Sequence, residues 1–160
     1  MRLGIIMHFS LNFLVLSTVQ LINDEFYSLN ISFDLNSFDD PIQNGEPDEF
    51  AQALLNILIN AKDIFLSRAV PDPKITITMG TSIGKAVLSI SDNGGGISLD
   101  TLDKMFEPYF TTKKPRQRKG TGLYIAKAVI EKKMGGRLRA PNLAEGAQFI
   151  MVFNRVYSEL

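Results

Sequence analysis

The chain has 160 residues, 45% of them hydrophobic and 21% charged, a composition that excludes an intrinsically disordered protein and suits one folded domain. Its 17 Lys and Arg balance its 17 Asp and Glu, which excludes a general attraction to nucleic acid or to an anionic membrane surface. The lack of cysteine excludes disulfides and thiolate metal sites, and with His8 as the only histidine no zinc site is expected. We expect one cytoplasmic domain over residues 9–154, with short termini at 1–8 and 155–160.

The segment from Gly4 to Ile22 is largely apolar and could be read as a signal peptide or a membrane span. Polar residues interrupt the run, no small-residue cleavage site follows it, and a span needs about 20 mainly apolar residues. Ser10 is instead a suitable N-cap for a helix. The apolar positions after it recur at helical spacing: Leu11, Leu14, Val15, Thr18, Val19 and Ile22. We therefore predict an amphipathic helix that packs on the domain without entering a membrane.

Clear local patterns continue through the first half of the chain. Apolar and polar residues alternate over 29–36, which predicts a strand, and the turn-forming residues of 36–46 predict a loop. Pro47 followed by two acidic residues is a favourable first helical turn. That helix should run to about Arg68 and stop before the prolines that follow.

The second half of the chain alternates strand and helix patterns with glycine turns. In order we expect a hairpin of strands 74–79 and 85–91, a glycine turn at 92–96, a short helix over 98–105, an irregular basic stretch over 107–119, a helix over 122–133, and strands at 137–140 and 147–154. No repeat or linker divides the chain. These elements predict an α+β fold, a two-layer sandwich with helices on one face of a sheet.

The predicted helix 47–68 carries a narrow polar stripe. Its members are Glu49, Gln52, Asn56, Asn60, Asp63 and Ser67. One interpretation is that the stripe faces solvent. However, Asn is a poor helix former, and two Asn four residues apart present two amide oxygens to one side, which suits a hard cation and its waters. The helix alone leaves both interpretations open.

Two glycine segments and the basic stretch between them suit an anionic ligand. Asp92 ends a strand and opens a glycine turn, where its carboxylate can accept a hydrogen bond from an exocyclic amine, although an ordinary turn has the same pattern. Gly120-Thr121-Gly122-Leu123 opens a helix whose backbone amides can bind phosphate, with neither Walker nor Rossmann spacing. The basic stretch over 110–119 is either a solvated loop or a movable lid over phosphates.

These segments, in their order, resemble the ATP-binding superfamily of gyrase B, the large heat-shock chaperones, histidine kinases and mismatch-repair ATPases. Asn56-Ile-Leu-Ile-Asn60-Ala61 is similar to the asparagine box, and Asp92-x-Gly94-x-Gly96 and Gly120-Thr-Gly122-Leu123 are similar to the two glycine boxes. The stretch Phe106–Lys113 resembles the phenylalanine box of histidine kinases in particular, and 134–136 and 142–149 resemble their closing strands. The resemblance covers nearly the whole chain and implies the Bergerat-type fold, with a mixed sheet.

The resemblance also assigns roles by position. Asp92 would bind the adenine amino group, with Gly94, Gly96 and Ile97 around the base. Asn60 would ligate Mg²⁺, and Asn56 would lie beside the phosphates or the waters of the metal. The triphosphate would be held by Lys113 and by the segment of Gly120, Thr121, Gly122 and Leu123.

One position implies which branch of the superfamily this chain follows. ATPase members carry a Glu as general base where this chain has Asn56, whose amide cannot accept a proton. The resemblance therefore implies a sensor histidine kinase domain that binds Mg-ATP and transfers its γ-phosphoryl group to a histidine on a dimerisation helix outside this chain, with a response regulator downstream. His8 is followed by Phe9 and Ser10, which does not match the acceptor motif, so no catalytic acceptor is expected here.

Two departures from the family pattern leave alternatives open. Arg118 stands where the second glycine box usually begins with glycine, and Asp63 stands where many members have Lys. Arg118 implies a lid that is shorter or held differently, and Asp63 implies the loss of one phosphate contact. An anti-sigma-factor-type serine kinase and a non-catalytic nucleotide-binding regulatory module therefore remain alternatives, while Asn56 argues against a hydrolysing ATPase.

Overall fold

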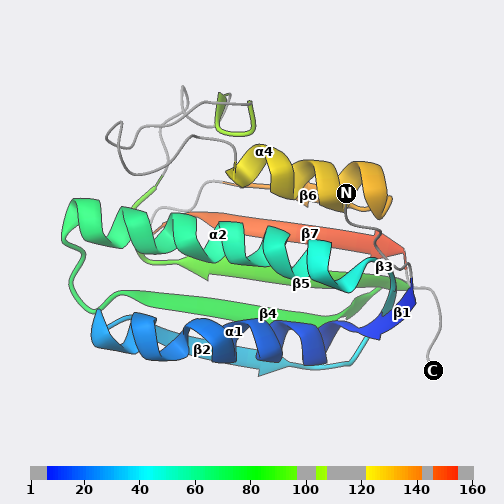
Figure 1. Cartoon of the computed structure of the whole chain (residues 1–160), viewed down its shortest axis with the longest axis horizontal. Coiled ribbons are helices and arrows are strands. Elements are labelled where there is room, and N and C mark those ends of the chain that lie inside the picture. The colour runs from blue at the N-terminus through cyan, green and yellow to red at the C-terminus, as the bar shows by residue number, and fades with distance from the viewer. Residues whose placement is uncertain (1–6, 97–103, 108–121, 142–145, 155–160) are drawn as a thin grey trace.

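The computed structural model describes residues 7–96, 104–107, 122–141 and 146–154. They form a five-stranded sheet with strand order β2-β4-β5-β7-β6, and helices cover one of its faces (Figure 1). The strands are β2 (Ser32–Ser37), β4 (Lys74–Ser82), β5 (Lys85–Asp92), β6 (Arg137–Arg139) and β7 (Gln148–Asn154), and the helices are α1 (Leu11–Ser28), α2 (Pro47–Arg68) and α4 (Gly122–Lys127), which continues as the π-helical segment η1 (Ala128–Lys133). β2 is parallel to β4, and the other neighbouring pairs are antiparallel. The predicted two-layer α+β sandwich with a mixed sheet is confirmed.

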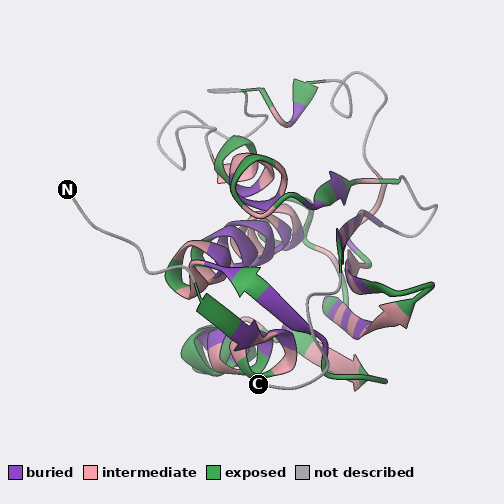
Figure 2. Ribbon diagram, turned by 90° about the vertical axis from the view of Figure 1, so that its right-hand side faces the viewer, coloured by how far each residue is buried: buried purple, intermediate pink, exposed green. Residues whose placement is uncertain are grey.

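The core lies between the helices and the sheet. Alternate residues of β4, β5 and β7 are buried, and Figure 2 shows buried residues gathered where α2 meets the strands. Phe50 of α2 packs edge-on against Phe153 of β7, with ring centroids 6.0 Å apart. Burial of one such side chain contributes about 1.5–3 kcal/mol. Because most of its inner face is buried in this way, α2 is a firm support for anything attached to its other sides.

Local sequence sets the ends of the first two helices as predicted. Ser10 caps α1 by accepting a hydrogen bond from the Phe13 amide at 3.1 Å. α1 continues beyond Ile22 to Ser28 because Phe26 extends its buried stripe. Among the described residues no helix is long and apolar enough to cross a membrane, and α1 packs along the domain as an amphipathic helix.

The second helix begins and ends where its sequence indicates. Glu46 caps α2 by accepting hydrogen bonds from the Asp48 and Glu49 amides, and Pro47 occupies the first turn. At the other end Ala69 adopts a left-handed conformation with φ of 49° and closes the helix directly after Arg68. The predicted helix from Pro47 to about Arg68 is confirmed.

The first part of the chain contains two strands that the sequence patterns did not indicate. β1 (Met7–Ser10) pairs antiparallel with β3 (Ile42–Gly45), so the loop predicted over 36–46 is wrong for its second half. β3 has the composition of a turn, and only its pairing with β1 makes it a strand. The strand predicted from residue 29 begins at Ser32, because 29–31 instead close α1 through hydrogen bonds to its last carbonyls.

Three further boundaries differ from the prediction. The β4–β5 hairpin is longer than expected and turns at Ile83 and Gly84, both at positive φ. The helix predicted over 122–133 has that extent, but its second half is π-helical, with the Met134 amide bonded to the Val129 carbonyl. The predicted helix over 98–105 lies mostly outside the described residues, as does the irregular stretch that follows.

Candidate functional site

The polar stripe of α2 faces α4 and η1 in its first half. Asn56 has only 6% of its surface exposed, and its Nδ2 donates a hydrogen bond to the Gly122 carbonyl at 3.2 Å, while its Oδ1 accepts one from Gln52 at 2.9 Å. Two turns earlier Glu49 forms an ion pair with Lys133 of η1. The interpretation of the stripe as a solvent face is therefore wrong for Asn56, whereas Gln52 is exposed. Asn56 ties the middle of α2 to the residue that opens α4.

The next turns of α2 carry the rest of the predicted site. Asn60 is half-buried, one helical turn after Asn56. One turn further on, Ile64 and Phe65 lie against the glycine turn, because a Cβ added to Gly94 would be 3.0 Å from Ile64 Cγ2 and 3.3 Å from the Phe65 ring. Along one helix the structure thus brings together the start of α4, Asn60 and the first glycine turn.

Asp92, the last residue of β5, is the centre of the glycine-turn region. Its Oδ1 accepts hydrogen bonds from the Gly94 amide at 2.9 Å and the Ala147 amide at 3.4 Å. No described residue donates to Oδ2. Burial raises the pKa of Asp92 above its usual value, while these two hydrogen bonds and the charge of Arg68 oppose the rise. The site therefore holds a largely buried carboxylate with one oxygen fixed in position.

Close backbone contacts make glycine necessary at two places around Asp92. A Cβ at Gly146 would lie 1.8 Å from the Asp92 carbonyl oxygen, a distance that no side chain can occupy. Gly95 adopts a φ of +89°, which favours glycine. The sequence comparison placed Gly146 only in a closing segment, and the structure shows that it packs directly on the proposed base-binding residue.

Two residues that the sequence analysis did not assign hold the glycine turn. Arg68 Nη1 donates to the Gly94 carbonyl at 2.8 Å and to the Gly96 carbonyl at 3.2 Å. Asn93 Oδ1 accepts from the Lys74 amide at 2.8 Å, and its Nδ2 donates to the Asp72 carbonyl at 3.0 Å. The sequence patterns marked Arg68 only as the approximate end of the helix, because its partners lie 26 and 28 positions away.

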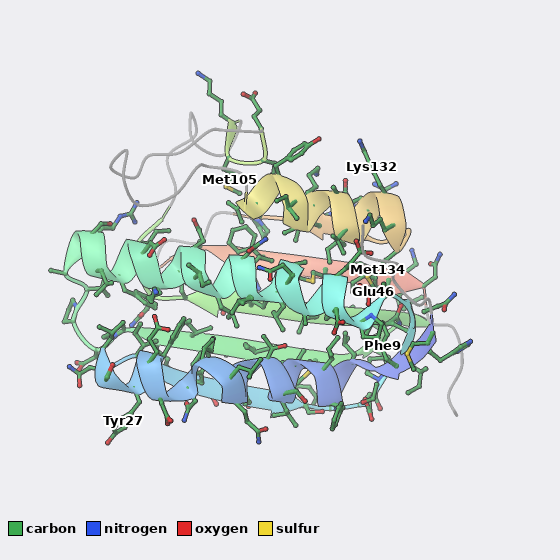
Figure 3. All side chains as sticks on the ribbon, in the orientation of Figure 1. Phe9, Tyr27, Glu46, Met105, Lys132 and Met134 are labelled. Carbon is green, nitrogen blue, oxygen red and sulfur yellow. The ribbon has the colours of Figure 1, made fainter. Side chains whose placement is uncertain are left out.

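Near the start of α4, an aromatic contact anchors residues 104–107. Phe106 packs edge-on against Phe149 of β7, with centroids 6.3 Å apart, and Lys127 Nζ lies 5.0 Å from the Phe106 ring centroid. Met105, labelled in Figure 3 near the start of α4, is 6% exposed. Met105 and Phe106 therefore attach this short segment to the core beside the start of α4.

Part of the predicted site cannot be placed. Ile97, Lys113, Gly120 and Thr121 lie outside the described residues, as do Arg118 and the rest of the basic stretch over 110–119. Gly122 and Leu123 are described and half-buried at the start of α4. In the described part of the chain no three His, Asp or Glu side chains cluster as they would around a metal held by protein ligands alone.

A cavity of about 460 Å³ lies at the other end of α2. It is lined by residues of β3, α2 and η1, and Figure 3 shows Glu46 and Met134 beside each other there. None of the predicted site residues lines it. The convergence of motifs on the C-terminal half of α2 therefore identifies the candidate site, and the cavity does not.

The chain is similar to known proteins in both sequence and structure. Residues 45–156 match the family model described as histidine kinase-, DNA gyrase B-, and HSP90-like ATPase. The sensor histidine kinase ZraS of Escherichia coli (strain K12) is 31% identical over 142 residues, which make up 88% of this chain and 29% of ZraS. The histidine-protein kinase AtoS of the same strain is 35% identical over 146 residues, 89% of this chain and 23% of AtoS.

Solved structures agree with this relationship. The catalytic domain of the histidine kinase ThkA has a TM-score of 0.82 and 26% identity, with 94% of this chain and 96% of that domain covered. The chain thus spans less than a third of ZraS and AtoS but nearly all of the isolated ThkA catalytic domain. It belongs to the family of histidine kinase-, DNA gyrase B- and HSP90-like ATPases and, within it, is a catalytic ATP-binding domain of the sensor histidine kinase type.

Proposed function

We propose that this domain binds Mg-ATP and transfers the γ-phosphoryl group to a histidine on dimerisation helices outside this chain. The observation that carries the proposal is the environment of Asn56. An amide, buried and bonded to Gly122, occupies the position on α2 that lies between the two glycine segments. An amide cannot accept a proton from water, so the site can hold ATP without supplying a base for its hydrolysis.

The base would bind at the glycine turn. Oδ1 of Asp92 accepts hydrogen bonds from two backbone amides. Its other oxygen, Oδ2, could accept a hydrogen bond that the adenine amino group donates. Gly96 is half-buried and has no side chain, so its backbone would allow the purine to approach closely, with the buried Gly94 beneath it. The phosphates would then extend along α2 toward Gly122 and Leu123, where backbone amides at the start of a helical segment favour anions.

The described residues fit a magnesium ion that is bound mainly through the nucleotide. Mg²⁺ in such sites keeps several waters and takes one or two protein ligands together with substrate phosphates. The half-buried amide oxygen of Asn60, between the two glycine segments, is a suitable single protein ligand. When bound, the ion would neutralise charge on the transferred phosphoryl group, while the protein positions the nucleotide.

The partners follow from the missing acceptor. We infer that the domain acts with dimerisation helices of the same or another kinase, on the cytoplasmic side of the cell, and that a response regulator receives the phosphoryl group. A crystal structure of the histidine kinase ThkA, 26% identical to this chain, contains that kinase in complex with the response regulator TrrA.

Calorimetric titration tests the proposal. A non-hydrolysable ATP analogue with Mg²⁺ should bind the wild-type chain, and Asp92→Ala should lose about 1.5–3 kcal/mol, the usual contribution of a hydrogen bond to a charged group. Steady-state ATP turnover should stay near background, and the chain should not label itself. Failure to bind any nucleotide would exclude the proposal, and substantial hydrolysis by the wild type would favour an ATPase.

A further inference from the structure

Arg68 directs its charged guanidinium to backbone carbonyls. Among the described residues no carboxylate forms an ion pair with it, whereas Lys62, Lys74, Lys127 and Lys133 all do so with acidic side chains. The Arg68 guanidinium instead spans the glycine turn, bonded through Nη1 to the carbonyls of Gly94 and Gly96. A Cβ on Gly95, between them, would lie 3.0 Å from the same nitrogen.

We propose that Arg68 is a positioning residue that holds the glycine turn and Asp92 in the geometry that recognises the amino group of adenine. The inference rests on the proposed function, because it assigns a role within the same nucleotide site. It gives α2 two tasks: Asn56 and Asn60 lie at the phosphate side of the site, and Arg68 fixes the base side eight residues after Asn60.

The physical argument begins with the backbone. Three consecutive glycines have more accessible conformations than any other sequence, so the turn needs external bonds to keep one shape. Hydrogen bonds from a guanidinium are charge-assisted and roughly twice as strong as neutral ones. Two of them bridge the turn, and the Gly94 amide within it bonds to Asp92. Movement of the turn would therefore move the carboxylate.

The charge of Arg68 also favours the form of Asp92 that recognition requires. An ionised carboxylate accepts a hydrogen bond from the adenine amine, whereas a protonated carboxyl would present a donor to it. The groups that face Asp92 are the Gly94 and Ala147 amides and Arg68. Arg68 is the charged member of this set, so its removal should weaken selection for an amino group as well as loosen the turn.

The experiment compares two nucleotides that differ at the recognised amine and at the adjacent ring nitrogen N1, which is protonated in inosine. Binding of a non-hydrolysable ATP analogue and of its inosine counterpart, which carries an oxygen in place of the amine, is measured by calorimetry with Mg²⁺. The variants are Arg68→Met, which keeps the apolar stem, Arg68→Lys, which keeps the charge but not the planar fork, and Arg139→Met as a control on the exposed β6 edge. Thermal unfolding of each variant is recorded in parallel.

We expect Arg68→Met to bind the adenine analogue about ten-fold more weakly, with a much smaller change for the inosine analogue. Arg68→Lys should recover part of the preference, and Arg139→Met should match the wild type. An equal loss for both nucleotides would make Arg68 merely structural and overturn the inference, as would an unchanged preference. If Arg68→Met does not fold, wild-type preference in Arg68→Lys overturns it as well. If the wild type binds neither nucleotide, the proposed function itself fails.

Discussion

The two glycine segments of the site are held in very different ways. The turn after β5 is fixed from several sides: Arg68 donates to its carbonyls, the side chain of its own residue Asn93 accepts from the Lys74 amide, and the backbone at Gly146 packs against Asp92. In the described residues, the start of α4 is joined to α2 by one side-chain hydrogen bond, from Asn56 to Gly122. Among the described residues, the glycine turn is thus held by more side-chain hydrogen bonds than the start of α4. Under the proposed function, such a division would let the nucleotide stay bound while its phosphate end moves.

The largest effect should come from breaking the base side at Gly146. In Gly146→Ala the new Cβ would overlap the Asp92 carbonyl oxygen, so β7 and β5 must separate locally. We expect a loss of about 3 kcal/mol in the free energy of unfolding, measured by urea denaturation. Gly80→Ala is the matched control, because its Cβ would meet only the Phe38 side chain at ordinary contact distance. Equal stability of the two variants would show that the close approach is not required.

A smaller loss of stability should follow when the hydrogen bond from Asn56 to the start of α4 is removed. Asn56→Ala leaves the Gly122 carbonyl and the Gln52 amide without their partner. The expected cost is about 1–2 kcal/mol in stability, together with faster hydrogen exchange at the start of α4 and unchanged exchange at Gly94. Asn23→Ala, on the exposed face of α1, serves as the control. If exchange rises equally at Gly94, the two sides are not independent.

The pH dependence of the free energy of unfolding tests the environment of Asp92 in the glycine turn. Because the pKa of Asp92 is raised in the folded state, the native protein binds its proton more readily than the unfolded chain. The contribution of Asp92 to the free energy of unfolding is fully present below its ordinary pKa of about 4. It is lost as the pH rises through the raised pKa of the folded state. Asp92→Asn should remove that decline and be slightly more stable at neutral pH, while nucleotide binding is weakened.

Urea unfolding between pH 4 and 7 measures this effect in both proteins. Asp63→Asn, on α2, is the control for the loss of an acidic residue outside the glycine turn. If the free energy of unfolding of the wild type rises with pH over this range relative to that of Asp92→Asn, the raised pKa of Asp92 is contradicted. A gain in stability with retained nucleotide binding would instead contradict the role of the carboxylate.

The smallest effect should come from the anchor beside α4. Lys127→Met removes the contact with the Phe106 ring and a half-exposed ion pair with Glu131 at 3.3 Å. Exposed interactions of both kinds are weak, so we expect a loss of about 0.5 kcal/mol by thermal unfolding. Lys132→Met, an exposed neighbour on η1, should be neutral. A loss above that of Asn56→Ala would mean that the aromatic anchor, and not Asn56, holds this region.

Local patterns in the sequence were sufficient for most of the fold. The Ser10 cap, the Pro47 start of α2 and the alternation within β4, β5 and β7 depend on residues a few positions apart. These features were predicted, although the β4–β5 hairpin is longer than expected. β3 was missed because its four residues resemble a turn, and its pairing with β1 joins residues more than thirty positions apart. The second half of the last helix was expected to be regular and is π-helical.

For the site, the sequence by itself determined which residue types are present and in what order, and this was sufficient to identify the family. Only the tertiary structure decided which way they face. Asn56 meets Gly122 across 66 positions, and Arg68 meets Gly94 across 26. The contact of Gly146 with Asp92 likewise joins the ends of two different strands. Helical and strand periodicities report which side of an element is polar, but the partner of that side is set by the packing of distant segments around a shared core.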